Sequence, residues 1–176
     1  NWVDQDIKIH HQDYTAKDFV VEADWSAASY YFSVVALAPD SKIILQGLHP
    51  ESLQGDSEVV QIYNNMGVHS EFDKDHNLHL HNNADVKGLL DYDFIDQPDL
   101  AQTVCVSIAG LGLQGLYTGL QTLRIKETDR IAALQTELAK LKVYISQMPI
   151  KFSPKKGVQY YMQEGRASTD SMPTFA

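Results

Sequence analysis

The fold of this chain is decided by the stretch Leu123-Arg124-Ile125-Lys126-Glu127-Thr128-Asp129-Arg130 and by the segment that it opens. The apolar residues that follow recur every three or four positions, at Ile131, Leu134, Leu138 and Leu141. That period is typical of an amphipathic helix, so we predict a helix over residues 127–141. Lys126 and Arg130, four positions apart, are then expected on one face of its entrance.

The charges of this stretch indicate an anion site. A helix N-terminus already favours anions, because its free N–H groups and the macrodipole are positive. Lys126 and Arg130 add two cations there, and Glu127 between them is a candidate acid or base. The alternative is ordinary helix capping with solvated salt bridges, in which these residues carry no chemistry.

Working outward, the same order of elements occurs twice. The first set comprises a helix over 26–37 capped by Asp24, a strand over 42–45, a helix from 56 or 57 to about 66 ended by Gly67, and strands over 68–72 and 77–81. The second set comprises a helix over 99–109, a strand over 116–118, the helix over 127–141, and strands over 143–146 and 158–161. The two sets lie roughly 70 residues apart, which indicates an internal structural repeat. Residues 1–22 are expected to be extended.

Composition narrows the function classes. The chain has 176 residues, of which 44% are hydrophobic, and a net charge of -9. Such a charge argues against a nucleic-acid or acidic-membrane surface. No apolar run reaches about 18 residues, so we expect no membrane span. The single cysteine, Cys105, is expected in the core and allows no disulfide within the chain, which fits the cytoplasm. Both ends suggest a fragment of a longer protein.

The charged octapeptide resembles the signature Leu-Arg-x-Lys-Glu-Thr-Asp-Arg of the EPSP synthase family (5-enolpyruvylshikimate-3-phosphate synthase). Further blocks resemble that family in the same order: Val21-Glu22-Ala23-Asp24-Trp25-Ser26-Ala27-Ala28-Ser29-Tyr30, Ser52-Leu53-Gln54-Gly55-Asp56, Met66-Gly67-Val68 and Asp96-Gln97-Pro98-Asp99-Leu100-Ala101-Gln102-Thr103. The resemblance covers residues 20–142. It implies an α/β (α+β) fold, an inside-out α/β barrel of repeated βαβαββ units, three per domain, with substrates between two domains.

For the domains, the resemblance implies that residues 1–21 are the tail of the opposite domain. Residues 22–176 would be two of the three units of one globular domain, about 22–90 and 91–176. We expect residues 1–21 to pack loosely or to pair with a second copy, because they would expose strand edges without partners.

For function, the resemblance implies transfer of the enolpyruvyl group of phosphoenolpyruvate to the 5-hydroxyl of shikimate 3-phosphate with release of phosphate, a step towards chorismate and the aromatic amino acids. Asp99 matches the base near that hydroxyl, and Glu127 the proton donor towards C3. Lys126 and Arg130 match substrate-binding cations. The family needs no cofactor and no metal, and the parent protein is expected to be a monomer in the cytoplasm.

Two considerations argue against the roles that the resemblance implies for Asp99 and Glu127. Asp99 follows Pro98 at a helix start, so it would also serve as an ordinary N-cap. Glu127 needs a raised pKa to donate a proton near neutral pH, whereas Lys126 and Arg130 would lower its pKa. Several substrate-gripping blocks of the family do not occur in the chain, so we predict that the chain alone is inactive, although it could self-associate.

Three rival hypotheses stay open. The first is the sister family, UDP-N-acetylglucosamine enolpyruvyl transferase, which shares the fold and reaction type. The second is a non-catalytic module that binds anions. The third is a metal site at His76, His79 and His81, because His79 and His81 would point to the same side of a strand.

Overall fold

The computed structural model describes residues 2–3, 6–86 and 88–168 of the chain. It contains helices α1 (Trp25–Leu37), α2 (Val59–Asn64), α3 (Ala101–Leu111) and α4 (Arg130–Lys140). The strands are β1 (Trp2–Val3), β2 (Asp6–Ile7), β3 (Lys42–Leu45), β4 (Met66–Phe72), β5 (Leu78–Val86), β6 (Leu89–Asp93), β7 (Gln114–Thr118), β8 (Tyr144–Gln147) and β9 (Tyr161–Glu164). Short 3-10 helices span Gly55–Glu58, Pro98–Leu100, Gln121–Ile125 and Ile150–Phe152.

Two sheets carry the repeat that the sequence predicts. The first has the order β3-β5-β4 and the second the order β6-β7-β9-β8. All pairs in them are antiparallel except β6 with β7, which is parallel. Strands β3, β4 and β5 therefore correspond to β7, β8 and β9, and helices α1 and α2 to α3 and α4. The second sheet has one further strand, β6, which the sequence analysis missed.

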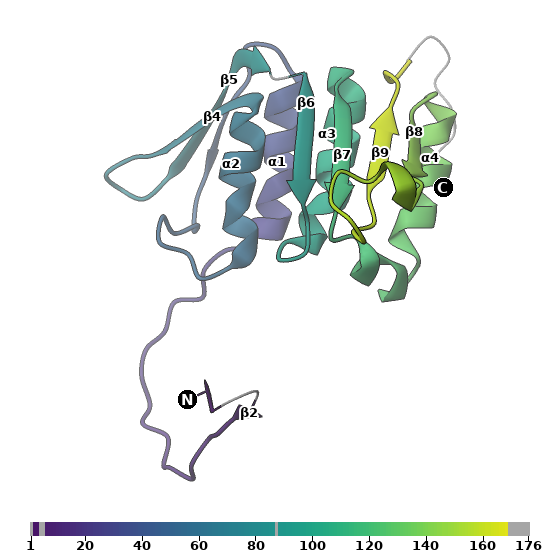
Figure 1. Cartoon of the computed structure of the whole chain (residues 1–176). Helices are drawn as coiled ribbons and strands as arrows, with labels where there is room; N and C mark the ends of the chain where they lie inside the picture. The colour runs from purple at the N-terminus through teal and green to yellow at the C-terminus, as the bar shows by residue number, and fades with distance from the viewer. Residues whose placement is uncertain (1, 4–5, 87, 169–176) are drawn as a thin grey trace.

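Helices α1 and α3 lie side by side at the centre of the molecule, and small polar side chains join them (Figure 1). Ser29 Oγ donates to Thr103 Oγ1 at 3.0 Å, and one helical turn further Ser107 Oγ donates to Ser33 Oγ at 2.8 Å. These hydroxyls are buried, and each has a partner, as burial of a polar group requires. Cys105 is fully buried in α3 as predicted, and burial raises the pKa of its thiol to about 12.

The helix predicted over 127–141 begins only at Arg130. Asp129 is its N-cap, and Asp129 Oδ1 accepts from the backbone N–H groups of Ile131 at 3.1 Å and Ala132 at 3.0 Å. A short carboxylate at this position satisfies two N–H groups that the helix itself leaves free. Lys126 and Glu127 therefore lie in the loop before the helix, and the prediction that Lys126 shares a helix face with Arg130 is wrong.

Other boundaries also differ from the prediction. The helix predicted from residue 56 or 57 to 66 begins as a 3-10 turn, and its α-helical part, α2, ends at Asn64. Gly67 does not end that helix but lies inside β4, with φ of 79°. The strand predicted over 158–161 is observed as β9, Tyr161–Glu164.

The N-terminal segment runs away from the body of the molecule (Figure 1). Residues 8–22 form no helix or strand, and Phe19, Val20 and Val21 are more than four-fifths exposed, at 85%, 91% and 81%. None of the helices in the described part of the chain has the length and apolar character needed to cross a membrane.

Candidate active site

Asp99 is the centre of the charged cluster. It lies in the 3-10 turn Pro98–Leu100, which buried Leu100 anchors in the core. Asp99 Oδ1 lies 3.1 Å from Lys126 Nζ and accepts from Arg130 Nη1 at 2.9 Å. The N-cap residue of this turn is Gln97 and that of α3 is Leu100, so the alternative that Asp99 is an ordinary N-cap is wrong. Its carboxylate instead faces two cations that come from a different segment.

The loop that carries Lys126 and Glu127 is fixed at both ends. The 3-10 helix before it is anchored by Leu123, which is fully buried, and Asp129 begins helix α4 after it. Arg124 also holds the loop, since its guanidinium donates to Tyr161 Oη at 3.0 Å and to Asp129 Oδ2 at 3.3 Å. Lys126 and Glu127 therefore project from a short, braced turn.

Arg130 joins two carboxylates. Its Nε and Nη2 atoms donate to Glu127 Oε1 at 2.9 and 2.6 Å, while Nη1 donates to Asp99. The planar guanidinium suits carboxylate and phosphate groups, because several N–H donors point in fixed directions. Lys126 and Arg130 thus meet at Asp99, Glu127 joins them through Arg130, and all four predicted site residues lie in one cluster.

Glu127 is held in its ionised form. A bond from its own backbone N–H lowers the pKa of its carboxyl, and Arg130 and then Lys126 lower it further. Glu127 in turn raises the pKa of Arg130. In this contact with Arg130, Glu127 can therefore accept a proton but has none to donate near neutral pH, as the sequence analysis anticipated.

A cavity of about 360 Å³ opens beside this cluster. Asp99, Glu127 and Arg130 line one side, and residues from the start of α1, among them Asp24, Ser26 and Tyr30, line the other. The sequence analysis assigned no site role to the α1 residues. The only sequence signal for them was the resemblance of residues 21–30 to a family block, since spacing alone does not bring Asp24 to Asp99.

Asp56 adds a third carboxylate next to Asp24 and Asp99, at the first turn of α1. Its Oδ2 atom accepts a hydrogen bond from Ser26 Oγ. Burial raises the pKa of Asp56, and the negative charges of Asp99 and Asp24 add to this effect despite the bond from Ser26. The side of the cavity formed by the first half of the chain carries the acidic Asp24, whereas the other side carries the cation Arg130 between Asp99 and Glu127.

The rival hypothesis of a metal site at His76, His79 and His81 receives no support. No three His, Cys, Asp or Glu side chains within the described residues are grouped so as to hold a metal ion. His79 Nε2 lies 2.9 Å from Asp73 Oδ2, and the ring of His76 stacks on His49 with centroids 5.8 Å apart. Bonds from His79 and Asn77 lower the pKa of Asp73, which ties the hairpin together.

Comparison with known proteins places the chain in one family. Residues 3–170 match the family model described as EPSP synthase (3-phosphoshikimate 1-carboxyvinyltransferase). A 3-phosphoshikimate 1-carboxyvinyltransferase of Bacteroides fragilis is 46% identical over 138 residues, which are 78% of this chain and 33% of that protein. The corresponding protein of Methanosphaera stadtmanae is 31% identical over 153 residues, 85% of this chain and 35% of its own length.

The fold has a solved counterpart. An EPSP synthase structure from Acinetobacter baumannii superposes with a TM-score of 0.55 and 21% sequence identity, covering 89% of this chain and 35% of that chain. At this identity the likeness concerns the fold alone. The chain spans about a third of the length of the curated relatives that it matches.

Proposed function

The chain belongs to the EPSP synthase family, and from that premise we propose that its parent protein moves the enolpyruvyl group of phosphoenolpyruvate to the 5-hydroxyl of shikimate 3-phosphate, releasing phosphate. The observation that carries this proposal is the convergence of Lys126 and Arg130 on Asp99. A carboxylate beside two cations and a cavity is the arrangement that the reaction of a hydroxyl with an anionic substrate requires.

Asp99 is the proposed base. Its carboxylate takes the proton of the 5-hydroxyl as the oxygen adds to C2 of phosphoenolpyruvate. Lys126 and Arg130 bind the anionic groups of the substrates, and Arg130 offers a planar fork to a carboxylate or phosphate. In this proposal the substrate anions replace Asp99 and Glu127 as partners of the two cations, which releases both carboxylates for proton transfer.

Glu127 is the proposed proton donor towards C3 of phosphoenolpyruvate. Its lowered pKa in the structure excludes donation as long as Arg130 holds it. A bound substrate anion near Lys126 and Arg130 would offset their positive charge and raise the pKa of Glu127. Protonation of C3 turns it into a methyl group and completes the tetrahedral adduct. Return of one methyl proton to Glu127, with departure of phosphate from C2, then forms the enol ether product.

Further expectations concern the domain organisation, the oligomeric state and location of the parent, and the activity of the chain alone. We propose that residues 22–176 form two units, about 22–90 and 91–176, of one domain, and that the parent is a cytoplasmic monomer. The two cations of the cluster can balance only part of the charge of two phosphorylated substrates. We therefore expect the 176-residue chain alone to show no turnover.

Phosphate release by the full-length parent tests the proposal. Phosphoenolpyruvate is supplied with either shikimate 3-phosphate or UDP-N-acetylglucosamine. Release is expected only with shikimate 3-phosphate, and Asp99→Asn should lower kcat by about 10²–10⁴-fold, the usual contribution of a general base. Asp91→Asn, at an exposed position of β6, is the matched control and should leave the rate unchanged.

Two other outcomes would assign a different function to the parent protein. Release with the sugar nucleotide would move the parent to the sister family. An absence of release with both acceptors would leave the cluster as an anion-binding module, and binding of phosphoenolpyruvate measured by calorimetry would then define its ligand.

A further inference from the structure

The two halves of the chain differ in the connection between their last two strands. In the first half residues 73–77 join β4 to β5 in a tight turn with two aspartates and one lysine. In the second half residues 148–160 join β8 to β9, and this longer loop carries three lysines but no Asp or Glu. A chain with a net charge of -9 therefore has a basic loop at this place.

The basic loop is held by its own hydrogen bonds. Gln159 Nε2 donates to the backbone oxygens at the two ends of the loop, at 3.0 and 2.8 Å. Val158 N donates to Lys155 O at 3.2 Å, which closes a β-turn. The third residue of this turn is Gly157, whose φ of 79° suits glycine. The turn thus fixes the backbone of the exposed residues Lys155 and Lys156.

A cavity of about 390 Å³ lies between this loop and the segment that follows β7 (Figure 1). Gln121 and Arg124 line one side of the cavity, and Gly157, Gln159 and Tyr161 line the other. Its volume is in the range of sites that bind small molecules. Arg124 gives the cavity a positive charge, and none of the described residues that line it is acidic.

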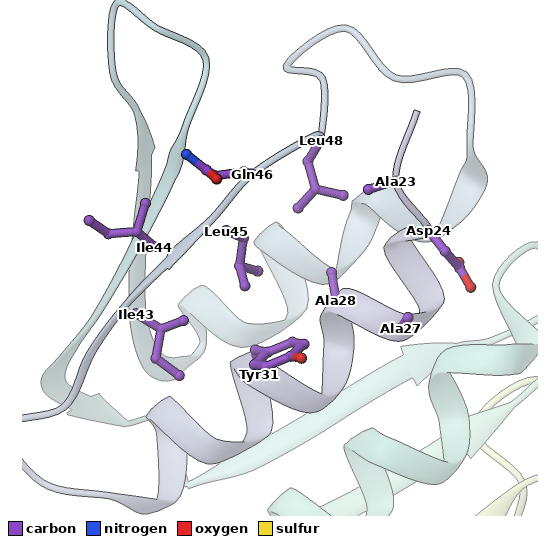
Figure 2. A pocket seen from close by; sticks show the side chains of 10 residues that line it. All are labelled: Ala23, Asp24, Ala27, Ala28, Tyr31, Ile43, Ile44, Leu45, Gln46 and Leu48. Atoms are coloured by element: carbon purple, nitrogen blue, oxygen red, sulfur yellow. The ribbon is translucent and has the colours of Figure 1, made fainter. Parts of the chain in front are cut away.

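Other cavities of the molecule have a different chemistry. The cavity between α1 and β3, of about 400 Å³, is lined mainly by apolar side chains such as Tyr31, and its charged residue is Asp24 (Figure 2). The cavity beside Asp99 is lined by three carboxylates and by Arg130. Since like charges repel each other, an anion meets less repulsion beside Arg124 than in either of these cavities.

Two hydrogen-bond donors of the cavity have no acceptor among the described residues. Tyr161 is only 5% exposed, and its Oη atom accepts from Arg124 Nη2 at 3.0 Å, so its own proton is left to donate. Arg124 uses Nη1 for Asp129 and Nη2 for Tyr161, which leaves its Nε–H group. Because a buried donor without an acceptor costs free energy, both groups favour a ligand oxygen.

We propose that this cavity binds the phosphate group of a small metabolite, at a site separate from the charged cluster. The phosphate oxygens accept from Arg124 Nε and from the Tyr161 hydroxyl, and such hydrogen bonds to a charged acceptor are strong. Lys155 and Lys156, directly before Gly157 in the turn, add positive charge nearby. A phosphate carries more charge and more acceptor oxygens than a carboxylate, so this set of groups favours phosphate.

NMR of the backbone amides of the 15N-labelled 176-residue chain, titrated with inorganic phosphate, tests the proposal. Saturable shifts are expected at residues 157–161, with smaller shifts when acetate replaces phosphate. The amides of residues 126–130 report the charged cluster separately, so binding there and binding in the cavity are told apart. The absence of a saturable shift at residues 157–161 would overturn the proposal, and equal responses to both anions would overturn the assignment to phosphate.

Matched variants test which cations hold the anion. The double variant Lys155→Ala and Lys156→Ala should weaken phosphate binding about three- to tenfold, because two nearby charges are lost. The control double variant, Lys42→Ala and Lys74→Ala, removes the same charge from exposed positions in the first half and should change the affinity less than about twofold. Equal effects of the two double variants would show a response to overall charge alone and would overturn the site.

Arg124→Gln tests the central donor. It should weaken phosphate binding by more than about tenfold, because a charge-assisted hydrogen bond is lost. Arg124 also braces the loop before α4, so the amides of α3 serve as the check that the body of the molecule is folded. Unchanged affinity in a folded Arg124→Gln variant would contradict the proposal, and the two lysine variants test it independently of this fold check.

Discussion

The two halves of the chain build the same junction from different chemistry. In each half, the loop after the strand that follows the first helix (β3 after α1, β7 after α3) returns to the start of that helix. In the first half, Gln54 Oε1 accepts from Trp25 N at 3.0 Å and Gln54 Nε2 donates to Ala23 O at 2.8 Å. In the second half, Lys126 Nζ reaches Asp99 Oδ1 at 3.1 Å. A neutral amide therefore bonds to backbone in one junction, and charged side chains meet in the other.

This difference separates a junction that stabilises the fold from one that serves the site. The Gln54 amide satisfies backbone groups at fixed positions, so its loss leaves them without partners. The ion pairs of the second junction are partly exposed, with 42% of the Asp99 side chain and 32% of the Lys126 side chain accessible, and such pairs contribute little to stability. We infer that the first junction holds the fold, while the second keeps its charges available to a substrate.

The strongest test of this comparison removes one side chain from each junction. Gln54→Ala should lower the free energy of unfolding by about 2–4 kcal/mol, because three hydrogen bonds, including one to Glu22 Oε2, are lost at roughly 1 kcal/mol each and the groups left behind are partly buried. Asp99→Asn should lower it by less than about 1 kcal/mol. Urea unfolding followed by circular dichroism measures both values.

Gln46→Ala is the control for the Gln54 variant. Gln46 also carries an amide, but its bond to Asn77 Oδ1 is exposed, so its removal should cost about 0.5 kcal/mol or less. A larger loss of stability in Asp99→Asn than in Gln54→Ala would reverse the assignment of the two junctions.

A second, smaller effect on stability is expected at the seam between the two halves, where Tyr63 of α2 meets Ser107 of α3. Tyr63 Oη and Ser107 Oγ lie 2.7 Å apart in the core, and Ser107 Oγ also donates to Ser33. Tyr63→Phe should lower the free energy of unfolding by about 1–2 kcal/mol, the usual cost of leaving a buried partner unsatisfied. Tyr31→Phe, at a half-exposed ring of α1, is the matched control and should be nearly neutral in the same urea experiment. Equal values for the two tyrosines would show that the seam is held by apolar packing alone.

Local sequence signals predicted the helices better than the site. Asp24 before a run of small residues predicted the start of α1. The structure confirms this cap, since the Asp24 carboxylate accepts from Ser26 N at 2.8 Å. The apolar stripe predicted the body of α4 but not its first residue, which the N-cap Asp129 sets. Strand β6 was missed because Leu89–Asp93 contains two aspartates and lacks the β-branched residues typical of strands.

The site itself was predicted through a resemblance, not through spacing. Asp99 meets partners 27 and 31 positions along the chain, and no periodicity encodes such a contact. The charge pattern around Lys126 did predict correctly that Glu127 would have a lowered pKa, because that effect is local. Contributions from α1, such as Ser26, depend on how the two halves pack and become visible only in three dimensions.

The smallest expected effect compares one carboxyl group from each junction across pH. The pKa values of Glu22 and Glu127 both lie below the ordinary value of 4.5. Burial of Glu22 opposes this shift, and bonds from Ser52, Trp25, His49 and Gln54 outweigh it. A carboxyl with a lowered folded pKa stabilises the fold above its unfolded pKa, and that contribution is lost as pH falls through the folded pKa.

The free energy of unfolding should therefore decline as pH falls below about 4.5, with about one proton or less taken up per group. Glu22→Gln should flatten this decline, since the neutral amide removes the titration of a carboxyl that Trp25 and Ser52 hold. Glu127→Gln should leave the decline almost unchanged, because its contact with Arg130 is exposed to solvent and screened by salt. Urea unfolding at pH 7, 4 and 3 in 0.15 M salt measures the two slopes. A flatter decline in Glu127→Gln than in Glu22→Gln would mean that the charged junction also supports the fold, and the separation between the two halves would then fail.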